Sequence, residues 1–209
     1  MSVSINHVFK QGPCIGTLFG VAMGALLPKK GGEVEAPGPK LSQVIPPRAP
    51  SLVSDYIAWC GGREDPVGVP PHLFPQWGFP PMAKALGNLP WPMTKVINQG
   101  CRLEVNGPLP AGEPLQVTTW LASVDEDEHK VRITTRILTG TKAQPDLVVA
   151  DVHAVVPLRR KKGGTKREPP TVPTDSHEIG RHALAARAGL DFALLTGDFN
   201  PIHWIPPYA

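Results

Sequence analysis

Hydrophobic and polar residues alternate with a period of two between residues 95 and 158, which is the pattern of β-strands with one buried face. Turn residues divide this region into segments rich in Val, Ile and Thr, which span 95–106, 113–124, 130–139 and 146–158. In the third segment the residues that share one face are Val131, Ile133, Thr135 and Ile137. Because the connections are short, the pattern predicts an antiparallel meander of four strands.

Apolar residues recur at helical spacing before this region. Residues 15–27 are apolar and Gly-rich, and we expect a short amphipathic or buried helix there, too short to span a membrane. Residues 51–59 predict a second helix with Ser51 as a candidate N-cap. We expect the helix that packs on the sheet at residues 80–89, because proline is tolerated in the first turn of a helix but restricts helix formation in the stretch before it. One short strand is expected at 41–45.

The chain changes character again after residue 158. Residues 159–173 are basic and rich in Gly and Pro, which predicts an exposed linker or long loop. Residues 176–195 predict a further helix, broken at Gly189.

The composition describes a globular chain without a strong charge bias. Hydrophobic residues make up 41% of the 209 residues, charged residues 19%, and the net charge is +3. So small a charge gives no reason to expect a nucleic-acid partner. Three cysteines (Cys14, Cys60 and Cys101) without CxxC spacing indicate a reducing compartment, so we expect the protein in the cytoplasm, or in an organelle of a eukaryotic cell. No metal site is predicted, because His177 and His182 lack a well-spaced third ligand.

An acid and an imidazole stand close together in residues 192–209, which read FALLTGDFNPIHWIPPYA. Asp198 and His203 flank an Asn200-Pro201 step, which disfavours helix and favours a turn. A kinked backbone can place both side chains on one side of a cleft, where they can move a proton on and off a substrate or a water. The alternative is a structural turn in which Asp198 caps a backbone amide and His203 packs in a wall.

The whole stretch resembles the hydratase signature of the MaoC-like family, the (R)-specific enoyl-thioester hydratases and dehydratases with the hotdog fold. That signature has an aromatic, an aliphatic and a small residue before Gly-Asp, then Asn-Pro, an aliphatic residue, His and a final small residue. Every specified position is filled here, by Phe192, Leu195, Thr196, Gly197, Asp198, Asn200, Pro201, Ile202, His203 and Ala209. The resemblance implies an α+β hotdog fold, in which a long antiparallel sheet wraps around a central helix.

The resemblance also implies a hydro-lyase of fatty-acid metabolism. Such an enzyme adds water to a trans-2-enoyl thioester to give the (R)-3-hydroxyacyl thioester, or catalyses the reverse dehydration. Asp198 and His203 would hold and activate one water and handle both proton transfers. Asn200 would either orient this pair or simply form the turn. Gly197 would let the backbone pass close to the substrate or adopt a positive φ.

The resemblance further suggests how a substrate is held. Trp204 and Tyr208 would line an acyl pocket, unless they serve only in packing. The acyl group would be carried by coenzyme A or acyl carrier protein, and no other cofactor is implied. The basic residues of 159–173 could attract such a phosphate-bearing carrier. Because hotdog units pair side by side, we expect a homodimer or an internal hotdog pair.

An internal similarity links the two helices that lie before and after the sheet. Residues 55–62 align with residues 191–198: an acid, an aromatic residue, three apolar positions, a small residue and Gly agree. Such similarity suggests duplication, although a match this short can also arise by chance. Gly62 stands where Asp198 stands, so the first unit would lack the catalytic groups.

These observations predict two hotdog units, the second of them incomplete. The expected divisions are an N-terminal helix and connector (1–40), a degenerate hotdog domain (41–158), a basic linker (159–173) and the start of a second hotdog domain with the motif (174–209). The family's oxyanion-binding amides begin the central helix, which would follow Ala209. We therefore expect this chain to be a fragment with little or no activity alone. The alternatives are a hotdog thioesterase, and a non-catalytic acyl-thioester-binding or interaction module.

Overall fold

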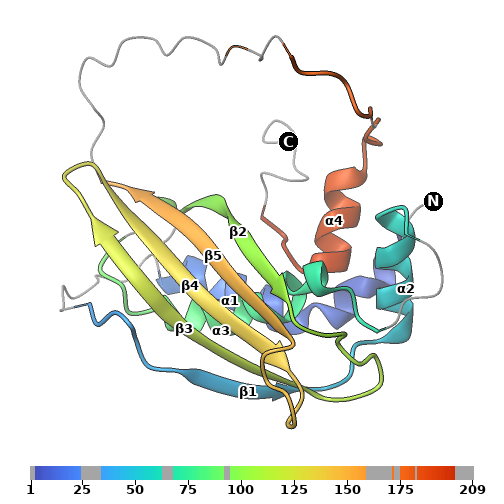
Figure 1. Cartoon of the computed structure of the whole chain (residues 1–209), viewed down its shortest axis with the longest axis horizontal. Coiled ribbons are helices and arrows are strands. Elements are labelled where there is room, and N and C mark those ends of the chain that lie inside the picture. The colour runs from blue at the N-terminus through green and yellow to red at the C-terminus, as the bar shows by residue number, and fades with distance from the viewer. Residues whose placement is uncertain are drawn as a thin grey trace.

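One face of a five-stranded antiparallel sheet carries the hydrophobic core of the protein. The computed structural model describes residues 3–24, 34–62, 68–91, 95–158, 171, 175–181 and 183–200. The strands are β1 (Leu41–Ile45), β2 (Ile97–Val105), β3 (Leu115–Glu126), β4 (Lys130–Gly140) and β5 (Val148–Pro157). Their order across the sheet is β1-β3-β4-β5-β2 (Figure 1).

The alternation of apolar and polar residues decides which face of the sheet is buried. Val131, Ile133, Thr135 and Ile137 of β4 are all buried, as the sequence predicts, and the residues between them are more exposed. The observed strands also begin and end close to the predicted limits. A period-two pattern therefore located the strands and their buried face correctly.

The prediction of a four-strand meander is wrong for β2. Strands β3, β4 and β5 follow one another, but β2 pairs with β5 at the edge of the sheet, and β1 takes the free edge of β3. The connection from β2 to β3 leaves the hairpin path because Leu109 is fully buried and accepts a hydrogen bond from the amide of Val69 at 2.8 Å. The connection is thus held against the segment at Val69 and does not form a hairpin between β2 and β3.

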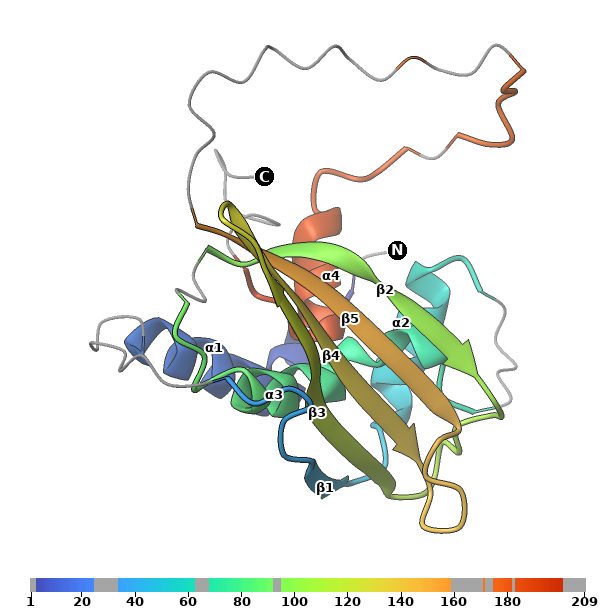
Figure 2. The ribbon, with the colours of Figure 1, turned by 60° about the vertical axis from the view of Figure 1, so that its left-hand side comes forward.

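Helix α3 (Pro75–Ala85) packs across the buried face of the sheet, against β1, β3 and β4 (Figures 1 and 2). The prediction placed this helix at 80–89, which is wrong at both ends, because Pro80 and Pro81 lie inside the helix and Pro75 begins it. Pro80 has no N–H to bond the carbonyl of Gln76. The thiol of Cys14 donates to that carbonyl instead, at 3.3 Å.

Two features fix α3 on the sheet. The indole Nε1 of Trp77 donates to Thr139 Oγ1 of β4 at 3.0 Å, and both residues are buried. Gly78 faces Ile137, and a Cβ at Gly78 would lie 3.0 Å from the Ile137 Cδ1. The helix backbone therefore lies very close to β4.

The remaining helices gather around α3 and beyond the edge of the sheet. They are the 3-10 helices η1 (Ile5–Lys10) and η2 (Pro71–Leu73) and the α-helices α1 (Gly12–Gly24), α2 (Pro50–Trp59) and α4 (Ala188–Thr196). Helix α1 packs on α3, and α4 contacts η1, α2 and α3 (Figure 2). No helix in the described ranges is both long and apolar enough to cross a membrane.

Three local predictions for these helices need correction. Helix α1 begins at Gly12 rather than at residue 15. Phe19 on it is 68% exposed and Cys14 only 1%, so of the two alternatives the fully buried helix is wrong. Ser51 is not the N-cap of α2, because Pro50 already occupies the first turn and Ala49 precedes it. Gly189 does not break a longer helix: α4 begins beside it, and the described residues between 176 and 187 are not helical.

We predict that Trp77→Phe lowers the free energy of unfolding by about 2–4 kcal/mol, because it removes the bond to Thr139 and leaves a void beneath the sheet. Urea unfolding followed by circular dichroism would measure the change. Trp59→Phe is the matched control, since Trp59 is 36% exposed, and it should cost about 1 kcal/mol or less. Equal losses in the two variants would contradict this role of Trp77.

A second prediction concerns the pair of Arg136 on β4 and Asp151 on β5. The guanidinium binds both carboxylate oxygens at 2.6 Å, and this hydrogen bonding lowers the pKa of Asp151. A lowered pKa stabilises the fold above the unfolded-state pKa of about 3.9, and this stabilisation is lost as the pH falls through the folded-state value. Asp151→Asn should therefore cost about 1 kcal/mol near pH 7 and progressively less below about pH 4.

Chemical denaturation at a series of pH values would test this prediction. Asp125→Asn serves as the control, because the Asp125 side chain is 70% exposed although it also contacts an arginine, Arg132. A cost of Asp151→Asn that does not change with pH would show that the ion pair is not its source.

Candidate functional site

The candidate site begins where α4 ends. The apolar residues before this end are buried, with Leu194 1% and Leu195 0% exposed, so they anchor the helix in the same core as the sheet. Gly197 follows in the left-handed conformation (φ 79°), and its amide donates to the carbonyl of Ala193 at 2.9 Å. This is the usual way in which a glycine ends a helix. Of the two roles considered for Gly197, the positive φ is confirmed, and a close approach of the backbone to a substrate stays a prediction.

A tight turn after Gly197 presents Asp198. The Oδ1 atom of Asp198 accepts a hydrogen bond from the amide of Asn200 at 3.1 Å, and the Asp198 amide donates to Thr196 Oγ1 at 3.3 Å. Asp198 and Asn200 are half-buried. The backbone amide of Asn200 thus holds the carboxylate of Asp198 and forms the turn, while a role of Asn200 in orienting the pair of Asp198 and His203 stays a prediction.

The structure brings together only part of the predicted site. Gly197, Asp198 and Asn200 lie within the described residues, whereas His203, Trp204 and Tyr208 lie outside them. The pairing of Asp198 with His203 and the acyl pocket therefore stay predictions. In the described residues no group of three or more His, Cys, Asp or Glu side chains could hold a metal ion.

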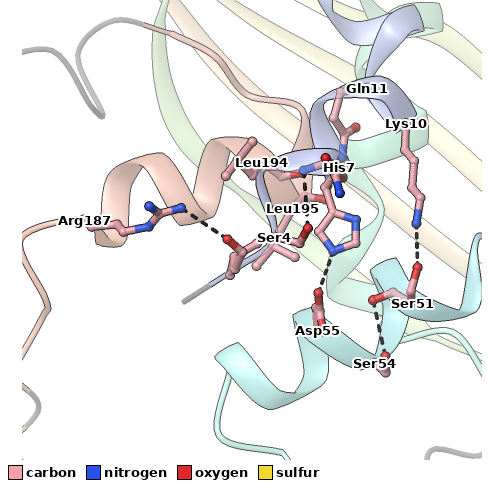
Figure 3. A network of polar contacts seen from close by, with 12 residues as sticks. Ser4, His7, Lys10, Gln11, Ser51, Ser54, Asp55, Arg187, Leu194 and Leu195 are labelled. Carbon is pink, nitrogen blue, oxygen red and sulfur yellow. Dashed lines mark hydrogen bonds and ion pairs between the residues drawn. The ribbon is translucent and has the colours of Figure 1, made fainter. Parts of the chain in front are cut away.

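The side chains of Gln11 and Cys14, from the N-terminal segment, lie against Gly197. A Cβ added there would lie 2.7 Å from Cys14 Sγ and 2.9 Å from Gln11 Oε1, which is closer than real contacts allow. Gln11 also donates from Nε2 to the carbonyls of Leu194 and Leu195, at 2.8 and 3.2 Å (Figure 3). The close neighbour that requires glycine at position 197 is thus the start of α1.

Burial beside Gly197 keeps the Cys14 thiol protonated. The pKa of Cys14 is raised to about 11, mainly by burial; the positive charge of Arg48 opposes this rise and the negative charge of Asp198 adds to it. Burial in turn lowers the pKa of Arg48. A protonated thiol can donate a hydrogen bond, and Cys14 donates one to the carbonyl of Gln76 on α3.

Sequence reasoning missed Gln11, Arg48 and Gln76, and it treated Cys14 only as a clue to the compartment. The available signal was indirect: Pro80 inside α3 leaves the Gln76 carbonyl without a helical donor, and a buried carbonyl needs one. The sequence does not say which residue supplies that donor.

The two helices related by the internal similarity end in the same way. Gly61 after α2 has φ 76°, close to the 79° of Gly197 after α4. Their aligned acids are both paired: Asp55 with His7 Nε2 at 2.6 Å (Figure 3), and Asp191 with Arg187 Nε at 2.7 Å.

The helices α2 and α4 also touch, with the rings of Trp59 and Phe192 at 6.3 Å between centroids. Gly62 occupies the position of Asp198, so the end of α2 carries no carboxylate there. Duplication and the division into two hotdog domains stay predictions, because a shared helix ending is a local feature.

No protein-family model matches this sequence, and no curated protein matches it. Solved structures do. HtdX from Mycobacterium tuberculosis is 17% identical with a TM-score of 0.59, over 79% of this chain and 67% of that one. The chain has the hotdog fold of the MaoC-like dehydratases. A MaoC-like dehydratase from Phytophthora capsici is 14% identical with a TM-score of 0.56, over 80% of this chain and 65% of that one.

A further structure extends this likeness to a much longer protein. Peroxisomal multifunctional enzyme type 2 from Drosophila melanogaster is 12% identical with a TM-score of 0.56, over 81% of this chain and 32% of that one. The predicted α+β hotdog fold is therefore confirmed. The chain spans about two thirds of the length of HtdX and of the Phytophthora enzyme, and identities this low concern the fold alone.

The two aligned glycines, Gly61 and Gly197, allow a controlled test of the close contact between Gly197 and Cys14. Gly61→Ala should cost about 1–2 kcal/mol, the price of a left-handed alanine, because no atom lies within 4 Å of its added Cβ. Gly197→Ala should cost roughly 1–3 kcal/mol more, since its Cβ would collide with Cys14. Urea unfolding of both variants would measure the difference, and equal costs would contradict the contact.

Proposed function

We propose that this protein is a hydro-lyase that interconverts trans-2-enoyl and (R)-3-hydroxyacyl thioesters. The observation that carries the proposal is the turn at the end of α4, where the amide of Asn200 orients the carboxylate of Asp198. That turn lies in a chain with the fold of the MaoC-like dehydratases, and its sequence continues through Pro201 to His203 as the hydratase signature requires.

The proposed reaction uses two proton transfers and no redox step. In hydration, Asp198 and His203 hold one water and take a proton from it, and its oxygen bonds to C3 of the enoyl group. The electron pair of the C2–C3 double bond moves toward the thioester carbonyl, and a proton is then delivered to C2. Each group that transfers a proton in this way contributes typically about 10²–10⁴-fold to the rate.

Other parts of the proposal concern the substrate and its setting. The acyl carrier is coenzyme A or acyl carrier protein, with Trp204 and Tyr208 beside the acyl chain and no other cofactor. The proposed assembly is a homodimer or an internal hotdog pair. The proposed compartment is the cytoplasm or a eukaryotic organelle, supported by three free cysteines, of which Cys60 and Cys101 are exposed.

A second candidate function is a non-catalytic acyl-binding or interaction module. Two observations favour it. The sheet with α3 forms a hotdog unit, and the end of α2 has Gly62, which carries no carboxylate, in the position of Asp198. On this alternative, Asp198 serves only to form the turn with Asn200. The two candidate functions predict different results when the carboxylate of Asp198 is neutralised.

We predict that Asp198→Asn and His203→Ala each reduce hydration of crotonyl-CoA by about 10²–10⁴-fold, while binding of the thioester is retained. The assay would use the protein in the full form that its source produces. Loss of the enoyl absorbance would measure turnover, and calorimetry would measure binding of the thioester. Asp146→Asn, at an exposed site between β4 and β5, is the matched control and should keep full activity. Thioester binding without turnover in the unmodified protein would favour the binding module.

A further inference from the structure

A row of polar side chains connects the far side of α3 with the end of α4. Arg48 Nη1 donates to Gln76 Oε1 at 2.7 Å, and Gln76 Nε2 donates to Gln11 Oε1 at 3.1 Å. Gln11 Nε2 then donates to the carbonyls of Leu194 and Leu195. Gln11 and Gln76 are 0% and 5% exposed, so they exchange these bonds with little competition from water.

The direction of every hydrogen bond in this row is determined by its two ends. A guanidinium can only donate, so the oxygen of the Gln76 amide must face Arg48 and its nitrogen must face Gln11. Backbone carbonyls can only accept, so the nitrogen of Gln11 must face α4 and its oxygen must face Gln76. Each amide therefore has one satisfactory orientation. Arg48 is itself held, because its Nε and Nη2 both donate to the carbonyl of Pro46.

The row ends one turn before Asp198. The last carbonyls of a helix have no donor within the helix, and those of Leu194 and Leu195 are buried, so Gln11 supplies what they lack. The Oε1 atom of the same Gln11 also fills the space beside Gly197. The side chain thus bonds the last turn of α4 and limits how closely the following turn can approach α1.

We propose that Arg48, Gln76 and Gln11 form a positioning relay that fixes Asp198 relative to the central helix α3. Gln11 makes the contact with α4, Gln76 holds Gln11 from α3, and Arg48 sets the direction of both amides. The consequence for turnover rests on the hydro-lyase function proposed above. The structural part of the proposal does not depend on it.

The deciding substitution is Gln76→Glu, which keeps the size of the side chain and its acceptor toward Arg48. It replaces the donor toward Gln11 with an oxygen, so two acceptors face each other and Gln11 loses its fixed orientation. The matched control is Gln144→Glu, which makes the same change of charge at an exposed site. All variants would be compared under conditions in which circular dichroism shows them fully folded.

Two independent measurements follow the position of α4. The first is the rate at which iodoacetamide labels Cys14 in a chain with Cys60→Ser and Cys101→Ser, since Cys14 is 1% exposed and lies against Gly197. The second is kcat and KM for crotonyl-CoA. We expect Gln76→Glu to label about tenfold faster and to lower kcat roughly 10–100-fold, with KM within about twofold, because small displacements of reacting groups cost rate more than binding. The control should change neither quantity.

The two possible failures are distinguishable. If the parent protein, in the full form that its source produces, is inactive while Gln76→Glu still exposes Cys14, the hydro-lyase function is refuted and the relay is supported. Unchanged labelling and unchanged kcat in Gln76→Glu would overturn the relay whatever the activity of the parent.

Two further variants keep the test decisive. If Gln76→Glu does not fold, Arg48→Met takes its place, since it removes the directing donor and should change both measurements in the same direction. Loss of the Arg48 charge alone would slow labelling, because this charge lowers the pKa of Cys14, so faster labelling in Arg48→Met would report displacement of α4. Gln11→Lys added to Gln76→Glu should restore slow labelling, because an ammonium donates both to the new carboxylate and to the α4 carbonyls. A failure of Arg48→Met to change either measurement would also overturn the relay.

Discussion

Buried carbonyl groups that have lost their helical donors are the constraint on which this structure depends. Pro80 leaves the carbonyl of Gln76 without its partner, and the end of α4 leaves those of Leu194 and Leu195 without theirs. All three are satisfied by one short segment, from Gln11 to Cys14. Because a buried carbonyl without a donor costs about 1–3 kcal/mol, this segment links α3 and α4 more firmly than apolar contact alone would.

The same segment joins the two ends of the chain. Gln11 and Leu194 are 183 positions apart, yet they share a hydrogen bond in the core. The candidate motif is therefore anchored on the N-terminal segment and on α3 through α4. Its position depends on polar contacts with a definite direction, as well as on the burial of Leu194 and Leu195. Hydrogen bonds depend on direction and the hydrophobic effect does not, so these contacts add a restriction on the rotation of the helix end.

The comparison of α2 with α4 separates what is needed for folding from what is available for chemistry. Both helices end at a left-handed glycine and both carry a paired acid, at Asp55 and Asp191. These features complete and anchor a helix in either place. A carboxylate that follows the glycine occurs only after α4, where the amide of Asn200 orients Asp198. That additional residue is the difference on which the proposed chemistry depends.

The sequence by itself determined the strands, the buried face of β4, the positive φ of Gly197 and the turn at Asp198. Each of these depends on residues close together in the chain, where periodicity and turn chemistry act. Only the tertiary structure decided that β2 pairs with β5 and that α3 contains its two prolines. It also decided that Gln11 lies beneath the motif, because burial of Leu109 and the missing donor of Pro80 act on partners far away in the sequence. Local patterns show that a carbonyl needs a donor, and the packing of the whole chain decides which residue provides it.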